Sequence, residues 1–391
     1  MAGHLGDFQL EIYLRGLAGE RPELPVTYDE LEVAARGAMT AEAFAYVAGG
    51  AGSERTLRAN RAAFDRWRLV PRMLRSVTDR ELSTEVLGTP MAAPVLLAPV
   101  GTASVIHPDA ERAQARAAAD LGLASVLSTA ASTSMEEVAA AAPEANRWFQ
   151  LYWPNDPELA ESLVRRAERA GYRAIVVTVD TWTMAWRPRD LALGHLPFLH
   201  GHGLANYFSD PVFRSRLAAP PESGPEARRA AILAFTGLFG NPSLSWSDLA
   251  TLRSWTTLPV LVKGVCHPDD ARAALDAGAD GVVVSNHGGR QVDGARAALD
   301  CLVDVADAVA ARGPVLFDSG IRSGADVLVA LALGADAVLV GRLWAFGLAL
   351  AGHRGVVHAM RALLAELDLT MALAGYRSPA DLDRRALAFE R

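Results

Sequence analysis

Residues 273–285 read AALDAGADGVVVS, and residues 329–340 read VALALGADAVLV. In each stretch an alanine-rich helical segment ends at a glycine, Gly278 or Gly334, and an apolar, valine-rich run follows at once. A glycine just beyond the last turn is a common helix stop, and a short apolar run bounded by turn residues is typical of a buried strand. The repeated fragment therefore predicts a unit in which a helix is followed by a strand.

Eight apolar runs of this kind follow one another from Pro94 onward, separated by helical stretches. Crossover connections in a parallel sheet impose this alternation. Eight units close a barrel, whereas an open doubly wound sheet usually has about five or six strands. We therefore predict an α/β fold of the (β/α)8 TIM-barrel type. The expected strands are residues 95–98, 124–128, 148–151, 174–179, 260–263, 281–285, 315–318 and 337–340.

Two segments do not fit the alternation. Residues 1–90 precede the first expected strand and are predicted to be mainly helical, flanking or plugging the barrel. Residues 182–243 contain many Gly, Pro and His residues and far exceed ordinary loop lengths of about 2–6 residues. Because this insertion follows the fourth strand, on the face where barrels carry their active sites, we expect a lid. Residues 1–391 are predicted to form a single domain.

Composition excludes several function classes. The 391 residues are 51% hydrophobic and 21% charged, which allows a large core. The net charge of −7 and the scattered arginines argue against a nucleic-acid partner. Cys266 and Cys301 form neither a disulfide framework nor a paired-thiol metal site, and no metal is expected. We expect a cytoplasmic protein without membrane attachment, because no signal-like segment and no bilayer-length apolar run is visible.

The sharpest chemical signal is SNHGGRQ at residues 285–291. Its glycines let the backbone approach a ligand closely, His287 can accept a proton near neutral pH, and Arg290 can hold a carboxylate through two hydrogen bonds. Asp180, at the end of the fourth strand, is placed to orient such a histidine, and Arg187 follows shortly. The plainer alternatives are a solvated turn, a helix-capping aspartate and an arginine in a surface ion pair.

Lys263 ends the fifth expected strand, so its ammonium would be carried into the barrel mouth. Burying that charge is costly unless a negative group lies opposite. A phosphate or a reduced flavin would serve. The alternative is a lysine that reaches outward to solvent.

The loops after the last two strands have the composition of a phosphate site. Residues 318–322 read DSGIR, and Gly341 and Arg342 follow the eighth strand. Barrels often hold a phosphate in these two loops, where glycine exposes backbone N–H groups and arginine neutralises the charge. Such a site indicates a phosphorylated ligand without choosing one.

Together with LVKG at 261–264, QLY at 150–152 and AYVAGGA at 45–51, the SNHGGRQ motif resembles the FMN-dependent 2-hydroxy acid oxidase and dehydrogenase family, which includes glycolate oxidase and lactate oxidase. The resemblance covers nearly the whole chain. It implies an enzyme that binds FMN, transfers two electrons from the CH–OH group of a small L-2-hydroxy acid to the flavin and then to O2, and forms a homotetramer or an octamer.

Within that family, three segments resemble lactate 2-monooxygenase. They are GGAGSERTLRAN at 49–60, DTWTMAWRPRDL at 180–191 and LANYFSDPVFR at 204–214. This resemblance implies either oxidative decarboxylation or release of a 2-keto acid with H2O2. Near the expected pocket, Ala130 and Met184 differ from the residues of related enzymes. The substrate's side chain is therefore left open and need not be the methyl group of lactate.

The resemblance also implies a role for each matching position. His287 is the expected base, Asp180 its partner, and Lys263 the cation beside the flavin. Residues expected to bind the substrate are Tyr46, Tyr152, Arg187 and Arg290. Residues expected to bind the cofactor are Pro99, Val100, Gly101, Ser128, Gln150, Thr178, Lys263, Ser285, Asp318, Ser319, Gly320, Ile321, Arg322, Gly341 and Arg342.

The sequence is also compatible with two other functions. A dehydrogenase on the same scaffold would deliver electrons to a quinone or a carrier protein. A non-catalytic barrel that binds a phosphorylated ligand belongs to a different class. The combination of His287, the arginines and Lys263 favours catalysis over binding alone.

Overall fold

The computed structural model describes residues 4–390 and contains a closed barrel of eight parallel strands. The predicted TIM barrel is therefore confirmed, and each strand lies within two residues of its expected bounds. The barrel closes where β11 pairs with β4, with Val340 opposite Leu97. In order around the barrel, the strands are β4 (Val95–Leu97), β5 (Ala124–Ser128), β6 (Asn146–Leu151), β7 (Ile175–Thr178), β8 (Val260–Val265), β9 (Gly281–Val284), β10 (Val315–Phe317) and β11 (Ala337–Val340).

The strands are buried on both faces, which is why their sequences are continuous apolar runs instead of alternating ones. Leu96, Trp148 and Leu316 belong to the cluster inside the barrel. Their neighbours along the strands pack outward beneath the helices. The hairpin of β2 (Thr84–Val86) and β3 (Thr89–Met91) closes the end at which the strands begin. There the indole Nε1 of Trp148 donates a hydrogen bond of 3.0 Å to Thr89.

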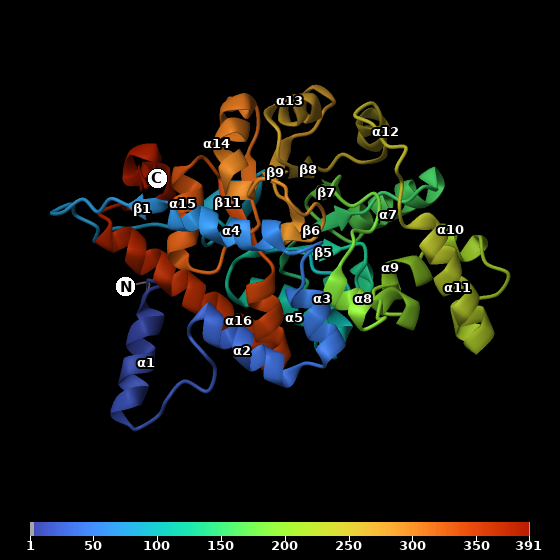
Figure 1. The fold of residues 1–391 in the computed structure, drawn as a ribbon, viewed down its shortest axis with the longest axis horizontal. Helices are drawn as coiled ribbons and strands as arrows, with labels where there is room; N and C mark the ends of the chain where they lie inside the picture. Colours follow the sequence, from blue (N-terminus) through green and yellow to red (C-terminus); the bar gives the residue numbers. More distant parts are fainter. Residues whose placement is uncertain (1–3, 391) are drawn as a thin grey trace.

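Helices surround the barrel (Figure 1). Gly278 and Gly334 follow α13 and α15 with φ angles of +99° and +114°, a conformation that suits glycine, so both predicted helix stops are confirmed. No helix within residues 4–390 has the length and apolarity needed to cross a membrane. The outer helices are α5 (Ala110–Asp120), α6 (Met135–Ala141), α7 (Pro157–Arg169), α12 (Asp248–Trp255), α13 (Pro268–Asp276), α14 (Ala298–Val309), α15 (Gly324–Ala332) and α16 (Arg342–Leu373).

The N-terminal segment is helical as far as Asp65, with α1 (Asp7–Leu17), α2 (Tyr28–Ala38), α3 (Ala41–Ala48) and α4 (Arg55–Asp65). Helices α1, α2 and α3 contact α16. Beyond α4 the segment differs from the expected helical pattern, since β1 (Trp67–Leu69) pairs with β12 (Leu387–Phe389) and the β2–β3 hairpin follows. These short strands depend on partners that local sequence does not reveal.

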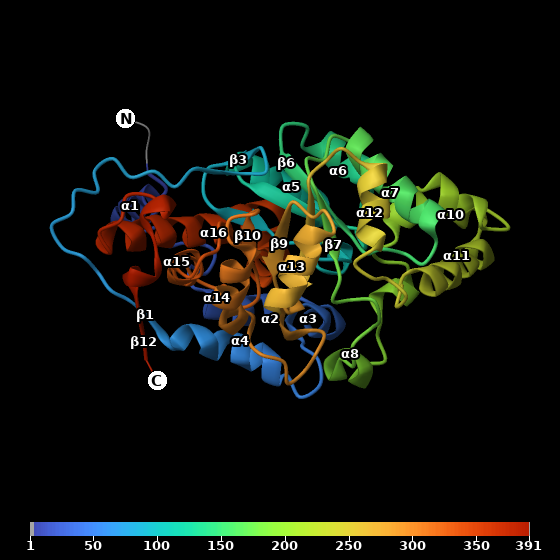
Figure 2. The same ribbon diagram turned by 90° about the horizontal axis from the view of Figure 1, so that it is seen from above.

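The insertion between β7 and α12 is mostly helical, although its composition suggested a loop. It contains α8 (Pro188–Ala192), α9 (Ala205–Phe208), α10 (Pro211–Ser215) and α11 (Pro225–Leu238). Helices α10 and α11 extend beyond the barrel, at the end of the molecule opposite α1 (Figures 1 and 2). Leu204, Tyr207, Phe213 and Phe235 are buried and join the main hydrophobic core. Part of the insertion therefore packs in the same hydrophobic core as the barrel and its helices.

Candidate active site

One cleft at the carboxyl ends of the strands brings together most of the residues that the sequence singled out. Ser128, Gln150, Asp180 and Ser285 do not line it, but Asp180 and Ser285 hydrogen-bond to residues that do. The expected site residues that line the cleft are Tyr46, Pro99, Val100, Gly101, Tyr152, Thr178, Arg187, Lys263, His287, Arg290, Asp318, Ser319, Gly320, Ile321, Arg322, Gly341 and Arg342.

His287 lies in the turn after β9, and its ring is held from one side. Its Nδ1 is 2.9 Å from Oδ1 of Asp180, which also accepts a 2.9 Å hydrogen bond from the Thr181 hydroxyl. Its backbone N–H donates to Oγ of Ser285 at 3.0 Å. The other ring nitrogen, Nε2, is 3.3 Å from the hydroxyl of Tyr152. One nitrogen is therefore oriented by a carboxylate while the other meets a cleft-lining hydroxyl.

Burial and charge give this pair complementary protonation states. Burial lowers the pKa of His287 and outweighs Asp180, which raises it. Burial alone would raise the pKa of Asp180, but His287 and Lys263 lower it by more. Near neutral pH a neutral imidazole thus faces an ionised carboxylate, the state in which a histidine accepts a proton.

The negative group that Lys263 requires is Asp318. The Lys263 ammonium lies 2.9 Å from Oδ2 of Asp318 and donates to Oγ of Ser285 at 2.9 Å. Burial opposes the charge, but Asp318 and Asp180 raise the pKa of Lys263 overall. Lys263 is 3% exposed, so a full positive charge sits inside the barrel mouth. The sequence motifs had associated Asp318 with the cofactor loop and did not indicate this pair.

Arg290 and Arg187 form a first concentration of positive charge. Arg290 donates to the carbonyl of Gly49 at 2.8 Å, and its guanidinium lies 5.1 Å from the ring centre of Tyr46. Arg187 donates to the carbonyl of Arg290 at 3.2 Å. Among residues 4–390, no carboxylate lies within ion-pair distance of either arginine, although Asp190 is near enough to raise the pKa of Arg290. Burial and the neighbouring Arg187 lower the pKa of Arg290. The two side chains therefore favour an anionic ligand.

Arg322 and Arg342 form a second concentration of positive charge. Arg342 donates to the carbonyls of Val47 and Gly49 at 3.1 and 3.0 Å. Arg322 stacks 4.3 Å from the ring centre of Tyr28. Burial and Arg322 lower the pKa of Arg342 by more than Tyr28 and Glu32 raise it, and the carboxylate paired with Arg322 is that of the exposed Asp29, at 3.9 Å. Arg322 ends the glycine-containing loop of residues 318–322, and Arg342 lines the same cleft, an arrangement suited to a phosphate.

Two buried polar atoms test whether FMN fits this cleft. Within the described part of the chain, Nε2 of Gln150 and Oγ1 of Thr178 have no hydrogen-bond partner. Buried polar groups are nearly always partnered, so the hydroxyl of Thr178, which lines the cleft, can bind a polar edge of a ligand. Together with the cations around residues 318–322, this hydroxyl fits a flavin ring joined to a phosphate.

Sequence reasoning missed several cleft residues. Tyr28, Thr181, Phe198 and Phe239 all line the cleft. Thr181 directly follows Asp180, a signal that was available. The two phenylalanines belong to the insertion, and nothing in their local sequence shows that they return to the barrel mouth. The insertion histidines showed no metal-ligand spacing, and residues 4–390 contain no group of three or more metal-binding side chains.

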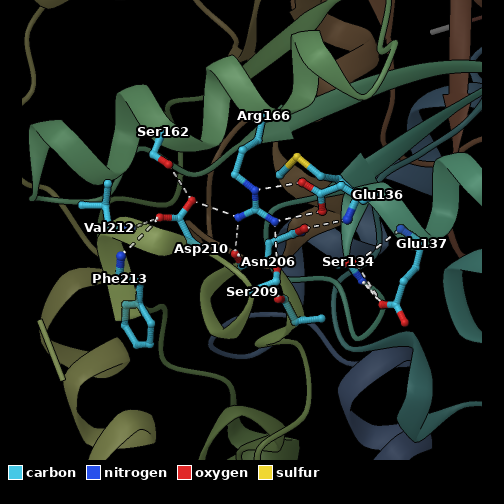
Figure 3. Close-up of polar contacts among 12 residues, drawn as sticks. Ser134, Glu136, Glu137, Ser162, Arg166, Asn206, Ser209, Asp210, Val212 and Phe213 are labelled. Atoms are coloured by element: carbon cyan, nitrogen blue, oxygen red, sulfur yellow. Dashed lines mark hydrogen bonds and ion pairs between the residues drawn. The ribbon is translucent and has the colours of Figure 1, made fainter. Parts of the chain in front are cut away.

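A buried ion-pair network fastens the insertion to the barrel (Figure 3). Arg166 of α7 donates to Asp210 at 2.9 Å, to Glu136 at 2.9 Å, and to the carbonyl of Asn206 at 2.8 Å. The amide of Asn206 then donates to the carbonyls of Ser128 and Thr129 at 3.2 and 3.1 Å. Residues 204–213 are therefore fixed to the carboxyl end of β5.

The fold and the charges define a barrel with one cleft that contains two concentrations of positive charge. Residues 35–389 match the family model described as FMN-dependent dehydrogenase, and the chain belongs to that family. The predicted family, the FMN cofactor and oxidoreductase chemistry on a CH–OH donor are thereby confirmed.

Named relatives are similar over almost their full lengths. FMN-dependent alpha-hydroxy acid dehydrogenase qulF of Penicillium citrinum is 43% identical over 382 residues, 97% of this chain and 95% of the relative. L-lactate oxidase of Lysinibacillus sphaericus is 41% identical over 368 residues, 94% of each. The structure of mandelate oxidase with (S)-4-hydroxymandelic acid superposes with a TM-score of 0.82 at 41% identity, covering 93% of this chain and 98% of the other.

Proposed function

We propose that this protein oxidises a small L-2-hydroxy acid at its hydroxyl-bearing carbon, with dioxygen as the final electron acceptor. The observation that carries the proposal is the Asp180–His287–Tyr152 chain in the same cleft as Arg187 and Arg290. It combines a base with a carboxylate-binding site, which are the two groups that a 2-hydroxy acid requires.

The cleft residues divide between cofactor and substrate. When bound, FMN accepts the two electrons that leave the substrate and passes them to dioxygen. Lys263 would supply positive charge to the flavin. Residues 318–322, Gly341 and Arg342 would hold its phosphate. Pro99, Val100, Gly101 and Thr178, which line the cleft, would contact the ring, and Ser128, Gln150 and Ser285, which do not line it, are the other proposed cofactor residues.

The chain's own groups control the substrate's charge and protons. Arg187 and Arg290 bind the carboxylate, and Tyr46 and Tyr152 contact its oxygens. His287 Nε2 takes a proton from the C2–OH unit, and Asp180 stabilises the resulting imidazolium. The substrate loses two electrons and two protons in total, which leaves a 2-keto acid.

The proposal extends to the fate of oxygen. A keto acid that leaves first is released with hydrogen peroxide. If it stays beneath the insertion, peroxide adds to its carbonyl and the C1–C2 bond breaks, giving an acid one carbon shorter, CO2 and water. We favour retention, as in a lactate 2-monooxygenase, because the insertion contributes Phe198 and Phe239 to the cleft and the Arg166–Asp210 pair fixes the insertion to the barrel. Peroxide and CO2 are measured per substrate consumed, in air without catalase. Near-stoichiometric peroxide with intact keto acid would contradict retention.

Anaerobic bleaching of the flavin tests the central claim. Mixing the yellow holoenzyme with a panel of 2-hydroxy acids should bleach it, and His287→Ala should keep its FMN while slowing bleaching by about 10²–10⁴-fold. Bleaching by none of them contradicts the proposal. Bleaching followed by reoxidation with a quinone but not with O2 indicates the dehydrogenase alternative. The proposal also includes a cytoplasmic homotetramer or octamer, which cell fractionation and light scattering test.

A further inference from the structure

One wall of the cleft is apolar and takes no part in the proton and charge chemistry. It contains Phe198, Phe239, Met184 and Ala130. The ring centre of Phe239 lies 5.1 Å from that of Tyr152, whose hydroxyl is 3.3 Å from Nε2 of His287. The apolar wall therefore begins beside the reacting atoms.

Small residues interrupt this wall. A Cβ placed on Gly101 would lie 3.2 Å from Cβ of Ala130, and one on Gly203 would lie 3.0 Å from the Phe198 ring and 2.8 Å from the carbonyl of Ala130. Gly203 also has a φ of +75°, which disfavours a side chain. Gly101 and Ala130, which both line the cleft, are therefore small residues packed closely against each other beside the aromatic rings.

The aromatic residues are held in place before any ligand arrives. Phe198 packs against Phe239 and Phe235 with centroid distances of 5.5 Å each. Tyr207 packs edge-on against Phe235 at 4.8 Å. Tyr207 follows Asn206, whose carbonyl Arg166 binds (Figure 3). The wall is thus preorganised, which reduces the entropy lost when a ligand binds.

The charged groups and the aromatic wall together suit a ligand whose two ends differ in chemistry. Arg187 and Arg290 favour a carboxylate, whereas Phe198 and Phe239 favour an apolar group, and aromatic pairs gain from edge-on or offset contacts. The methyl of lactate or the hydrogen of glycolate would make few contacts with these rings. We propose that the preferred substrate is an aryl-substituted 2-hydroxy acid, with Phe198, Phe239 and Ala130 as specificity-determining residues. This inference rests on the proposed function.

Mandelate, lactate and glycolate are compared as substrates, and phenylacetate and propionate as non-reacting ligands by titration calorimetry. We expect kcat/KM for mandelate to exceed that for lactate at least tenfold, and phenylacetate to bind at least tenfold more tightly than propionate. Phe239→Leu should lower kcat/KM for mandelate by roughly tenfold and change lactate by less than about twofold. Ala130→Phe, which places a bulky ring in the cleft wall, should act in the same direction.

Phe208→Leu is the matched control, because Phe208 is a partly buried aromatic residue of the insertion that does not line the cleft. It should leave the mandelate-to-lactate ratio unchanged. Bleaching by lactate with an equal or poorer response to mandelate overturns this inference and leaves the proposed function intact. Equal binding of phenylacetate and propionate, or equal loss of both substrates in Phe239→Leu, also overturns it. The absence of bleaching by every acid, with tight phenylacetate binding, contradicts the proposed function alone.

Discussion

Oδ1 of Asp180 lies 2.9 Å from Nδ1 of His287, although the two residues follow strands that are not neighbours in the barrel. Strand β8 lies between β7 and β9, and Gly264 on β8 makes the contact possible. A Cβ on Gly264 would lie 2.8 Å from Cβ of Asp180, and its φ is +110°. A side chain at this position would therefore push the carboxylate away from the histidine.

Asp180→Asn should slow anaerobic flavin bleaching by about 10²–10⁴-fold, because the amide cannot stabilise an imidazolium. Stopped-flow absorbance measures the rate. Thr181→Val is the control, since it removes a hydrogen bond to Asp180 but keeps the carboxylate, and it should cost less than tenfold. An Asp180→Asn rate equal to that of the parent would remove Asp180 from the mechanism.

The pH dependence of kcat/KM should report His287. The base acts when neutral, so kcat/KM should rise with pH through the histidine's pKa and then remain constant. Burial lowers that pKa below its usual value of 6.5, which places the rise below pH 6.5. Asp180 raises the same pKa, so Asp180→Asn should shift the rise to lower pH still. A rise centred above pH 7 would contradict the assignment.

Lys263→Met should strongly destabilise the protein, because it leaves Asp318 buried without its cation. Removing one partner of a buried pair costs about 3–5 kcal/mol. The double variant Lys263→Met/Asp318→Asn should recover a large part of that loss, since neither charge remains. Urea unfolding of the parent, both single variants and the double variant completes the cycle. Strictly additive losses would show that the 2.9 Å contact contributes no coupling.

Arg290→Lys should raise KM by roughly 10–100-fold, as expected for the loss of a charged hydrogen bond of about 1.5–3 kcal/mol, with a smaller effect on kcat. An ammonium cannot reproduce the two-pronged guanidinium contact. Steady-state kinetics with the best substrate measures the effect. A lower kcat with an unchanged KM would mean that Arg290 does not bind the substrate's carboxylate.

Arg166→Met should loosen the insertion, because the Asp210 side chain is 0% exposed and would lose its cation. Limited proteolysis should then cut within residues 204–216 at least tenfold faster. The adjacent Arg165→Met is the control. Arg165 pairs with Glu161 on the helix surface, with 48% and 38% of the two side chains exposed, and such pairs contribute about 0.3–0.5 kcal/mol. Equal cleavage of both variants would exclude an anchoring role for Arg166.

The sequence by itself determined the barrel and the strand-end chemistry. Parallel strands buried on both faces must be continuous apolar runs, so eight strands could be located to within two residues. The carboxyl ends of those strands share one rim, which placed Lys263 and His287 in a common site before any distance was known. Motif resemblance added the FMN cofactor, because SNHGGRQ at residues 285–291 is the hallmark of the FMN-dependent family, whereas its residue types alone indicate only a closely bound ligand.

The tertiary structure alone decided which groups face one another. Lys263 is paired with Asp318, Phe198 and Phe239 return to the cleft, and β1 finds its partner in β12. The local hydrophobic pattern indicates whether a residue lies in a helix or a strand and whether it is buried, because both depend on residues nearby in the sequence. Contacts between distant segments depend on how the intervening chain packs. In this protein that packing includes an insertion fixed by Arg166 and Asp210, which are 44 residues apart in the sequence.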